Sequence, residues 1–386
     1  MDQLKPTSIN SCPLTPLTFL ERAAIAYGES ISIVYNSTTY TWSETFARCV
    51  RLASSISSLI KKGEVVSVLA PNIPPTLELQ FAVPMAGAVL NNINTRLDAK
   101  TVSVLLQHSE SKLVFVDYQL YSLVLQSISL FPSDMYPPIL VLIEDENSVS
   151  FSRNLDFDEL TTYEAMVVKG NSNFVWVRPE NDWDPMTLNY TSGTTASPKG
   201  VVHSHRSLFI ITVDSLVDWS VPSYPVYLWT LPMFHSNGWS YTWGMAVVGG
   251  TSICLRKFDA NVVFRAITKY NVTHMCGAPV VLTMLANSPC AKPLKDPVQF
   301  RTAVVARPDE FWGETPCAFV SLKMELKKKP KEKQIIDFCR ERLPHYMIPK
   351  TVIFMDELPK TATGKIQKFS LREIANGMGS LPASRM

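Results

Sequence analysis

No long uninterrupted hydrophobic run occurs in this sequence. The longest apolar stretches, such as residues 81–90, are broken by Pro84 and are too short to span a bilayer. Residues 1–16 include Asp2, Lys5 and several prolines, and they hold no apolar core of the kind found in signal peptides. These absences predict a soluble protein without a transmembrane helix or a secretory signal.

The sequence also lacks the cysteine pattern of a disulfide-rich domain or a zinc ribbon. There are seven cysteines, an odd number, and no two of them have the C-x-x-C spacing: Cys12, Cys49, Cys254, Cys276, Cys290, Cys317 and Cys339. Both features argue against a disulfide framework and a structural zinc site. We expect reduced thiols and an intracellular location.

The charge of the chain is nearly balanced. Lysine and arginine together number 36, and aspartate and glutamate number 34, which gives a formal net charge of +2. So small an excess provides no long-range field for nucleic acid or for an anionic membrane. We therefore expect neither as a partner, and we interpret the basic run at residues 327–331 as a solvated loop rather than as a nuclear-import patch.

The composition is that of a globular protein. The 386 residues are 46% hydrophobic and 18% charged, which suits roughly two to three domains with a buried core. Thr15 is expected to cap a helix that starts at Pro16, and a hairpin over residues 31–41 and a helix over 43–60 follow. The alternation of helix and strand continues to Val116 and predicts a mostly parallel sheet covered by helices.

A second α/β block is expected over residues 184–289. A connector then leads to a smaller unit, which ends in a helix from Ser370. The strands expected in these two parts are the apolar runs at 187–190, 226–231, 251–255, 273–276, 303–306, 317–323 and 350–355, and a further helix is expected over 331–342. The sequence therefore predicts a large and a small α/β unit.

The segment most informative about chemistry is residues 190–200, Tyr-Thr-Ser-Gly-Thr-Thr-Ala-Ser-Pro-Lys-Gly. It is expected to lie between a short strand and a helix from Ser207. A loop this rich in glycine and hydroxyl side chains offers free N–H and O–H donors to a polyphosphate, and Lys199 adds a positive charge. No Walker A sequence and no G-x-G-x-x-G occurs in the chain. The segment predicts a phosphate-binding loop of another type.

At this loop the sequence resembles the adenylate-forming acyl-activating enzymes, which include acyl-CoA synthetases, luciferases and peptide-synthetase adenylation domains. The resemblance is nearest to plant acyl-activating enzymes of the short-chain, medium-chain and aromatic acid–CoA ligase type. Further segments that carry it are residues 66–72, 86–92, 231–239, 277–279 and 359–365. Together they cover nearly the whole chain, and the phosphate loop and the segment Pro-Lys-Thr-Ala-Thr-Gly-Lys at 359–365 are the most specific.

The resemblance implies an ATP-dependent carboxylic acid–CoA ligase that forms an acyl-adenylate, with ATP, Mg²⁺ and CoA as co-substrates and a small carboxylic acid as substrate. It implies that Lys365 bridges the carboxylate and the α-phosphate and that His235 helps to position the acyl group. The β- and γ-phosphates would be held by Thr191, Ser192, Gly193, Thr194, Thr195 and Lys199. The acyl pocket would include Met233, Trp239, Gly277, Ala278 and Pro279. A metal site at His203 and His205 is not expected, because no further ligands stand at suitable spacing.

The chain departs from the family pattern after Pro279. The family has there a Tyr-Gly-x-Thr-Glu motif for adenine and magnesium, an aspartate for the ribose and a hinge, and this chain has none of them. It continues instead into residues 302–310, which resemble the middle of the small domain. The resemblance thus implies a shortened adenylation domain over 1–290, a connector over 291–300 and a partial C-terminal domain over 301–386.

The expected fold is a large N-terminal domain of layered, mostly parallel sheets with helices, plus a small α+β domain that lacks its first part. We expect weak or absent ligase activity, since adenine, ribose and metal contacts are lost, and exposure of Val304, Val305 and Phe319. The alternative is a non-catalytic remnant that binds nucleotide and acyl group without turnover.

The last three residues, Ser384-Arg385-Met386, follow the form of a peroxisomal targeting signal. They predict a peroxisomal location and an import receptor as a partner, with the cytoplasm as the alternative.

Overall fold

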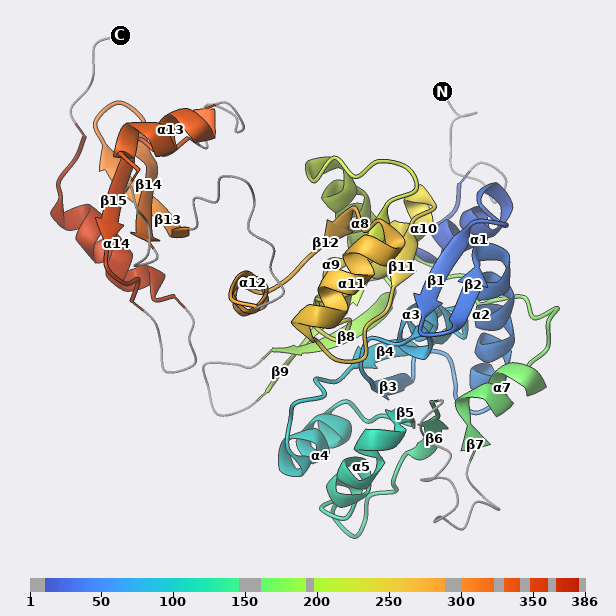
Figure 1. Ribbon diagram of the computed structural model, residues 1–386. Coiled ribbons are helices and arrows are strands. Elements are labelled where there is room, and N and C mark those ends of the chain that lie inside the picture. The colour runs from blue at the N-terminus through green and yellow to red at the C-terminus, as the bar shows by residue number, and fades with distance from the viewer. Residues whose placement is uncertain are drawn as a thin grey trace, which may run out of the picture. The chain divides into compact units, whose positions relative to one another are not determined.

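The computed structural model describes residues 11–145, 161–191, 198–288, 300–322, 330–340, 348–359 and 366–381. These residues form two compact units, Met1–Ala278 and Pro279–Met386 (Figure 1). Both units mix helices with sheets, and most strand pairs in the larger unit are parallel, as the sequence predicts. The domain limits at residues 290 and 301 stay a prediction.

The larger unit contains a seven-stranded sheet in the order β7-β6-β5-β3-β4-β8-β9. All neighbours are parallel except β8 and β9. The apolar strand β5 is buried throughout, as expected where helices cover both faces of a parallel sheet. The strands are β3 (Val65–Leu69), β4 (Val89–Asn92), β5 (Leu113–Asp117), β6 (Ile139–Ile143), β7 (Thr161–Thr162), β8 (Pro185–Thr191) and β9 (Lys199–Ser204).

A five-stranded sheet in the order β12-β10-β11-β1-β2 completes the sheets of this unit. Its strands are β1 (Ile31–Tyr35), β2 (Thr38–Thr41), β10 (Val226–Leu228), β11 (Thr251–Ile253) and β12 (His274–Met275). The N-terminal hairpin β1–β2 thus joins strands of the second predicted block, and β8 and β9 of that block join the first sheet. The two blocks that follow one another in the sequence are therefore interleaved in space.

The helices of the larger unit connect and cover these strands (Figure 1). They are α1 (Leu17–Ala26), α2 (Trp42–Ser57), α3 (Pro74–Met85), α4 (Ala99–His108), α5 (Tyr121–Ile128), α7 (Tyr163–Lys169), α8 (His205–Asp218), α9 (Ser236–Trp239), α10 (Tyr241–Val248) and α11 (Ala260–Tyr270). Helix α2 starts at a capping box, in which Thr41 Oγ1 accepts from the Glu44 N–H and Glu44 accepts from the Thr41 N–H. Such caps contribute about 1 kcal/mol.

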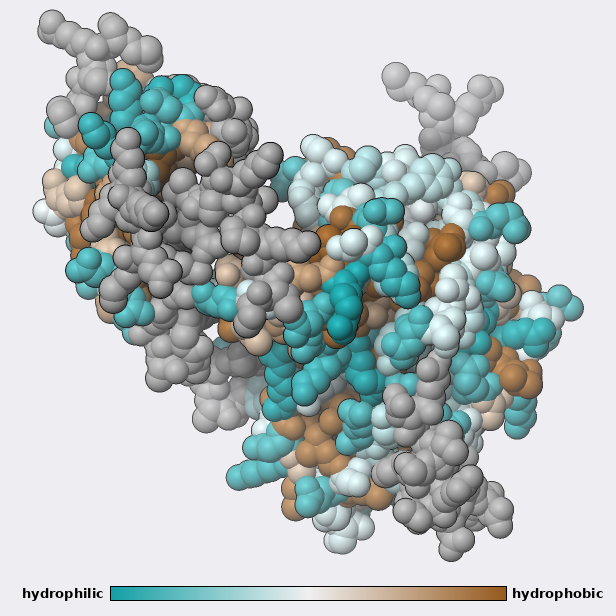
Figure 2. All heavy atoms as spheres, in the orientation of Figure 1, coloured by the Kyte–Doolittle hydropathy of each residue, from teal (hydrophilic) through white to brown (hydrophobic). Residues whose placement is uncertain are grey.

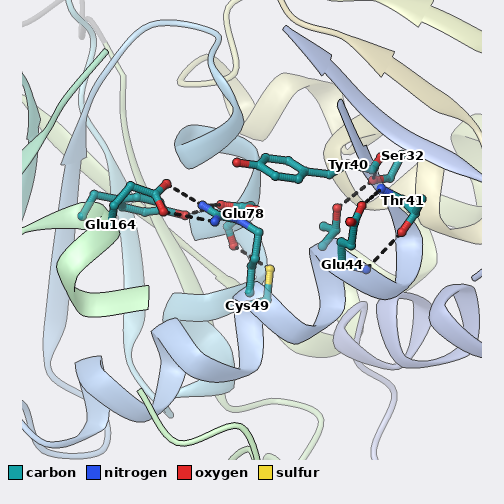
Figure 3. A network of polar contacts seen from close by, with 10 residues as sticks. Ser32, Tyr40, Thr41, Glu44, Cys49, Glu78 and Glu164 are labelled. Atoms are coloured by element: carbon teal, nitrogen blue, oxygen red, sulfur yellow. Dashed lines mark hydrogen bonds and ion pairs between the residues drawn. The ribbon is translucent and has the colours of Figure 1, made fainter. Parts of the chain in front are cut away.

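A partly buried ion network joins three of these helices (Figure 3). Arg48 of α2 lies between Glu78 of α3 and Glu164 of α7, with N–O distances of 2.6 Å to each. The Glu78 side chain is fully buried and also accepts from the Tyr163 hydroxyl at 2.5 Å. Burial raises the pKa of Glu78, and the Arg48 guanidinium opposes this shift. The network fixes α2, α3 and α7 against one another.

The smaller unit is a three-stranded sheet with helices. Its elements are β13 (Phe300–Asp309), β14 (Gly313–Leu322), β15 (Thr351–Met355), α12 (Pro279–Ala286), α13 (Glu332–Arg340) and α14 (Lys368–Gly377). Strand β14 pairs antiparallel with β13 and parallel with β15. The predicted exposure is confirmed for Val304, which is 45% exposed. It is wrong for Val305 and Phe319, which are buried in one cluster with Leu371 and Ala375 of α14.

In the part of the chain that the structure describes, no helix combines the length and the apolar character that crossing a membrane requires. Large hydrophobic residues are exposed at many separate positions. On the face drawn in Figure 2, hydrophobic areas alternate with polar ones. Such scattered exposure is ordinary for a protein surface.

Helix α8 begins at a buried histidine. The predicted cap of α1, Thr15, accepts from the Leu17 N–H through its Oγ1 at 3.3 Å, and the same Oγ1 lies 2.8 Å from His205 Nδ1. His205 is 6% exposed, and burial lowers the pKa of His205 to about 4, with Asp184 opposing the shift. The imidazole is therefore neutral in the folded protein at physiological pH.

Because the imidazole of His205 is buried and neutral, we expect the folded protein to lose stability in mild acid. The unfolded chain binds its proton near pH 6.5 and the folded chain near 4, so the stabilisation is complete above pH 6.5 and is lost as the pH falls towards 4. We expect a loss of about 3 kcal/mol, measured by urea unfolding across this range. The variant His205→Gln should lack this component of the pH dependence, and an unchanged dependence would contradict the prediction.

Candidate active site

A cavity of about 480 Å³ lies within the larger unit. Its wall is formed by strands β8 and β9, helix α8 and the chain from α9 into α10. The lining residues are Asn189, His203, Ser207, Leu208, Ile211, Ser215, Ser236, Asn237, Trp239, Ser240 and Tyr241. Both apolar and hydroxyl side chains face this space, and its size suits a small organic molecule.

One side of the cavity is a left-handed turn of the backbone. Five consecutive residues, from Ser236 to Ser240, have φ between 47° and 66°. This conformation costs an L-residue roughly 1–2 kcal/mol, and it is rare in a continuous run. Only Gly238 adopts it without that cost, and a Cβ there would stand 2.5 Å from Trp229 Cζ3.

Buried amide side chains hold this turn in place. Asn237 is 1% exposed; it accepts from Asn189 Nδ2 at 2.7 Å and donates to Gln80 Oε1 at 2.9 Å. Gln80 in turn exchanges two hydrogen bonds with Asn92. Thr242 also donates to the Asn237 carbonyl at 3.1 Å. Strain of this kind persists only where surrounding contacts enforce it, and it is concentrated at functional sites.

The effect of the Asn237 amide hydrogen bonds on stability can be separated from that of the backbone strain by substitution. Asn237→Ala removes the amide bonds and keeps a Cβ at positive φ, whereas Asn237→Gly removes the same bonds without the backbone strain. We expect both to destabilise the protein, and alanine to be worse by about 1 kcal/mol, measured as the free energy of unfolding in urea. A glycine variant less stable than the alanine variant would argue against strain at this turn.

The structure places the predicted acyl-pocket residues at different positions. Trp239 lines the cavity and is 47% exposed. Met233 is fully buried in the core, where its N–H donates to Asn72 Oδ1 at 2.8 Å, and it does not line the cavity. The exposed His235 precedes α9, next to the lining residue Ser236. The remaining three are at or near the surface and are not among the lining residues: Gly277, Ala278 and Pro279.

The predicted phosphate loop connects two antiparallel strands. Thr191 ends β8 and pairs with Lys199, which starts β9, and both are exposed. The predicted helix is found as α8, and β9, a strand that was not predicted, lies between the loop and this helix. The backbone of Gly200 does not have a positive φ. A Cβ added at Gly200 would lie 3.0 Å from Leu188 Cδ1. Outside the described residues lie Ser192, Gly193, Thr194, Thr195 and Lys365.

The histidines His203 and His205 have different surroundings. His203 lines the cavity, and burial lowers its pKa, whereas His205 is turned to Thr15. Within the described ranges, no three side chains of His, Cys, Asp or Glu come together as a metal site.

Sequence reasoning missed the buried amides Gln80, Asn189 and Asn237. They lie in three different elements, α3, β8 and α9, and their contact depends on these elements, which are far apart in the chain. The Asn237-Gly238 dipeptide is a signal of positive φ and could have indicated the turn.

Comparisons with known proteins agree with the resemblance. The sequence model of a family described as AMP-binding enzyme matches residues 20–353. The 2-methylpropanoate–CoA ligase CCL4 of Humulus lupulus is 44% identical, with 99% of each chain covered. A protein named probable acyl-activating enzyme 5, peroxisomal, of Arabidopsis thaliana is 43% identical, with 100% of each covered.

Solved structures of similar fold include the N-terminal domain of FACL13 from Mycobacterium tuberculosis. It has a TM-score of 0.62 and 25% identity; the match covers 71% of this chain and 65% of the solved one, slightly less than two thirds. A fatty acyl CoA synthetase of the same organism has a TM-score of 0.61 over 95% of this chain and 99% of the other, and at 19% identity it shows the fold alone.

The length of the alignment with the Humulus protein shows that the two chains differ in length away from their ends. The match to the Humulus protein runs over 549 positions and reaches nearly both ends of each chain. Because this chain has 386 residues, at least 163 of those positions hold none of its residues. The chain is thus shorter than this relative in its interior.

Proposed function

Because the chain belongs to the AMP-binding enzyme family, we propose that it is an ATP-dependent carboxylic acid–CoA ligase. The observation that carries the proposal is the family match over residues 20–353, together with end-to-end similarity to a CoA ligase. In the proposed reaction a carboxylate oxygen attacks the α-phosphorus of ATP and pyrophosphate leaves. The CoA sulfur then attacks the acyl carbon, the thioester forms and AMP leaves.

The residues assigned to the phosphates are those of the hydroxyl-rich loop. Thr191 and Lys199 stand opposite each other where the loop leaves the sheet, which suits them to face one polyanion from two sides. Their donors would neutralise charge that develops on the leaving pyrophosphate. The assignment extends to Ser192, Gly193, Thr194 and Thr195, and Lys365 is assigned to the reacting carboxylate and α-phosphate.

We place the acyl group in the cavity beside Trp239, with His235 at its edge. The left-handed turn supports this placement, since strained backbone is typical of ligand sites. Met233 would support the pocket indirectly, by packing in the core and so fixing the segment that leads to the turn. The assignment of Gly277, Ala278 and Pro279 to the pocket wall rests on the resemblance.

We propose a low rate for this chain compared with longer relatives. The motifs that serve adenine, ribose and magnesium in the family are missing from the sequence, and single stabilising donors of this type are worth roughly 3 kcal/mol in a transition state. Mg²⁺ would enter with the ATP phosphates. No proposed step depends on it.

Pyrophosphate–ATP exchange on the purified chain tests the proposal. We expect exchange that depends on an added acid, with 2-methylpropanoate as the first acid because a 44% identical relative is named for it. ATP binding by calorimetry without exchange would favour the non-catalytic alternative. If neither this chain nor a version with the missing stretch restored binds ATP, the proposed function is wrong.

We propose a peroxisomal location, on the tripeptide Ser384-Arg385-Met386 and on the relative named peroxisomal. The tripeptide lies outside the described residues. A fluorescent fusion with this tripeptide at its C-terminus is expected in peroxisomes and, without it, in the cytoplasm. An unchanged distribution would contradict the proposal and its import-receptor partner.

A further inference from the structure

The sheet of the smaller unit has a long outer strand. Strand β13 is 10 residues long, and in the order β13-β14-β15 it stands at the edge of the sheet that the structure describes (Figure 1). Each of its residues from Phe300 to Asp309 has a partner in β14, in continuous register. The other edge of an outer strand presents a row of N–H and C=O groups with which another strand can pair.

A contact near the end of β13 shows which backbone groups point away from β14. The Pro308 carbonyl accepts from the Leu381 N–H at 3.0 Å, and the Glu310 N–H donates to the Leu381 carbonyl at 3.1 Å. The direction of these groups alternates along a strand. The same edge therefore carries the N–H and C=O groups of Thr302, Val304 and Ala306. Among the described residues, none forms a backbone hydrogen bond to these groups.

This open stretch lacks the features that protect an outer strand. Residues 302–306 read Thr-Ala-Val-Val-Ala, without charge and without proline, whereas natural edges are protected by charged residues, proline or bulges. Val304, at the centre of the stretch, is 45% exposed. The resemblance places β13 directly after the segment that this chain lacks. An apolar side chain and backbone groups available for pairing are thus open at the same place.

The open stretch is complementary to itself. In an antiparallel pair of two β13 strands centred on Val304, this residue lies opposite its own copy and Thr302 lies opposite Ala306. The outward groups of all three residues then meet one another, which gives about six hydrogen bonds. The two Val304 side chains, adjacent across the axis, cover each other. Centring the pair on Val305 instead would put Thr302 opposite Pro308, which has no N–H.

The nearest charges flank the pairing and do not oppose its centre. Arg301 and Arg307 stand on either side of the open stretch and lie opposite each other in this register. The Arg307 guanidinium is directed into its own unit, where it donates to the Gly379 carbonyl at 3.2 Å and to Thr351 Oγ1 at 3.0 Å. Because salt screens the repulsion between these charges, added salt should strengthen the pairing.

We propose that two copies of this chain pair through β13, antiparallel and centred on Val304, so that two smaller units form one continuous sheet. Because both copies use the same edge, the assembly closes as a two-fold dimer and offers no β13 edge to a third copy. The net charge of +2 gives little repulsion between copies. The pairing needs neither ATP nor an acid, so its test is independent of the proposed ligase function.

Sedimentation velocity of the full chain tests the proposal. We expect a species of twice the mass of one chain, which dissociates on dilution and is strengthened by added sodium chloride. Val304→Lys puts two like charges opposite each other and should raise the dissociation constant at least about tenfold. The control is Val202→Lys, at a valine of the outer strand β9 that is 59% exposed, and it should leave the dimer unchanged.

Four results would overturn the proposal. They are a chain that stays monomeric up to about 100 µM, a dimer that dissociates in salt, a dimer weakened equally by both lysine variants, and a dimer weakened by neither.

Disulfide formation across the axis tests the register and does not depend on the lysine variant. The Cα atoms of hydrogen-bonded residues that face each other in an antiparallel pair lie ~5.5 Å apart, a separation that a disulfide spans. Oxidised Val304→Cys should therefore run as a covalent dimer on a non-reducing gel. Val202→Cys and the wild-type chain, whose Cys12 is exposed, give the background. A yield of the Val304→Cys dimer no higher than this background overturns the proposal, also where Val304→Lys fails to fold.

Discussion

Replacement of Lys365 by alanine is expected to lower pyrophosphate–ATP exchange by roughly 10²–10³-fold. The reaction brings a carboxylate to a triphosphate, so one cation between them stabilises charge that exists only in the transition state. Loss of one such donor has an effect of this size in other enzymes. The proposed role of Lys365 rests on the resemblance at residues 359–365 alone, since this residue lies outside those that the structure describes.

A matched control is available in the same segment. Lys360→Ala removes the same charge five positions earlier and is expected to leave exchange within about twofold, because the resemblance assigns the reacting groups to Lys365. Equal losses in both variants would show that the basic segment acts through its general charge. A Lys365→Ala variant with full exchange would remove this lysine from the proposed mechanism.

Replacement of Arg256 by alanine is expected to destabilise the larger unit by about 3–5 kcal/mol. Arg256 Nη1 lies 2.9 and 3.0 Å from the two oxygens of Asp117, and Nη2 pairs with Asp145. Both aspartate side chains are at most 2% exposed. Tyr35 of β1 joins the group, accepting from Arg256 Nε at 3.1 Å and donating to Asp145 at 2.8 Å.

The size of this effect comes from the buried carboxylates that would be left without their cation. An exposed pair is the control: Arg178 bonds Glu21 at 3.1 Å with 51% and 36% exposed side chains, and Arg178→Ala should cost no more than about 1 kcal/mol. Both variants are compared by urea unfolding at neutral pH. Similar losses would mean that the Arg256 group contributes no more than a surface pair.

The pH dependence gives a second check on Arg256→Ala. Burial raises the pKa of Asp117, and the hydrogen bond from Arg256 opposes the shift. Without the arginine that pKa rises further above the unfolded value, so the folded variant takes up a proton more readily than the unfolded chain. Its deficit relative to the wild type should therefore shrink as the pH falls. A deficit that grows in acid would contradict this account.

The helices and strands were largely predictable from hydrophobic pattern. The hairpin at residues 31–41, the buried strand at 65–70 and the final helix all have counterparts in β1–β2, β3 and α14. Alternation and helical periodicity indicate which face of an element is buried. They do not indicate its partner, and for that reason the pairing of β1 with β11 could not be predicted.

The candidate site was predictable only where residue types alone express the chemistry. The phosphate loop was proposed on that basis and stays a prediction, whereas Trp239, which lines the cavity, was named only through the resemblance. The left-handed turn depends on Gln80 and Asn189, which reach Asn237 from other elements. The two aspartates that pair with Arg256 likewise lie at or just after the ends of β5 and β6, in another sheet. Polar contacts between distant elements leave little trace in a single sequence.

The pairing of β1 with β11 has a consequence for synthesis of the chain. Ile33 and Ser252 are neighbours in the sheet but 219 positions apart in the chain. At a ribosomal rate of ~5–20 residues per second, β1 waits roughly 10–40 s for its partner. During that interval Ile33 and Val34, both buried in the finished protein, remain open to chaperones and to other nascent chains.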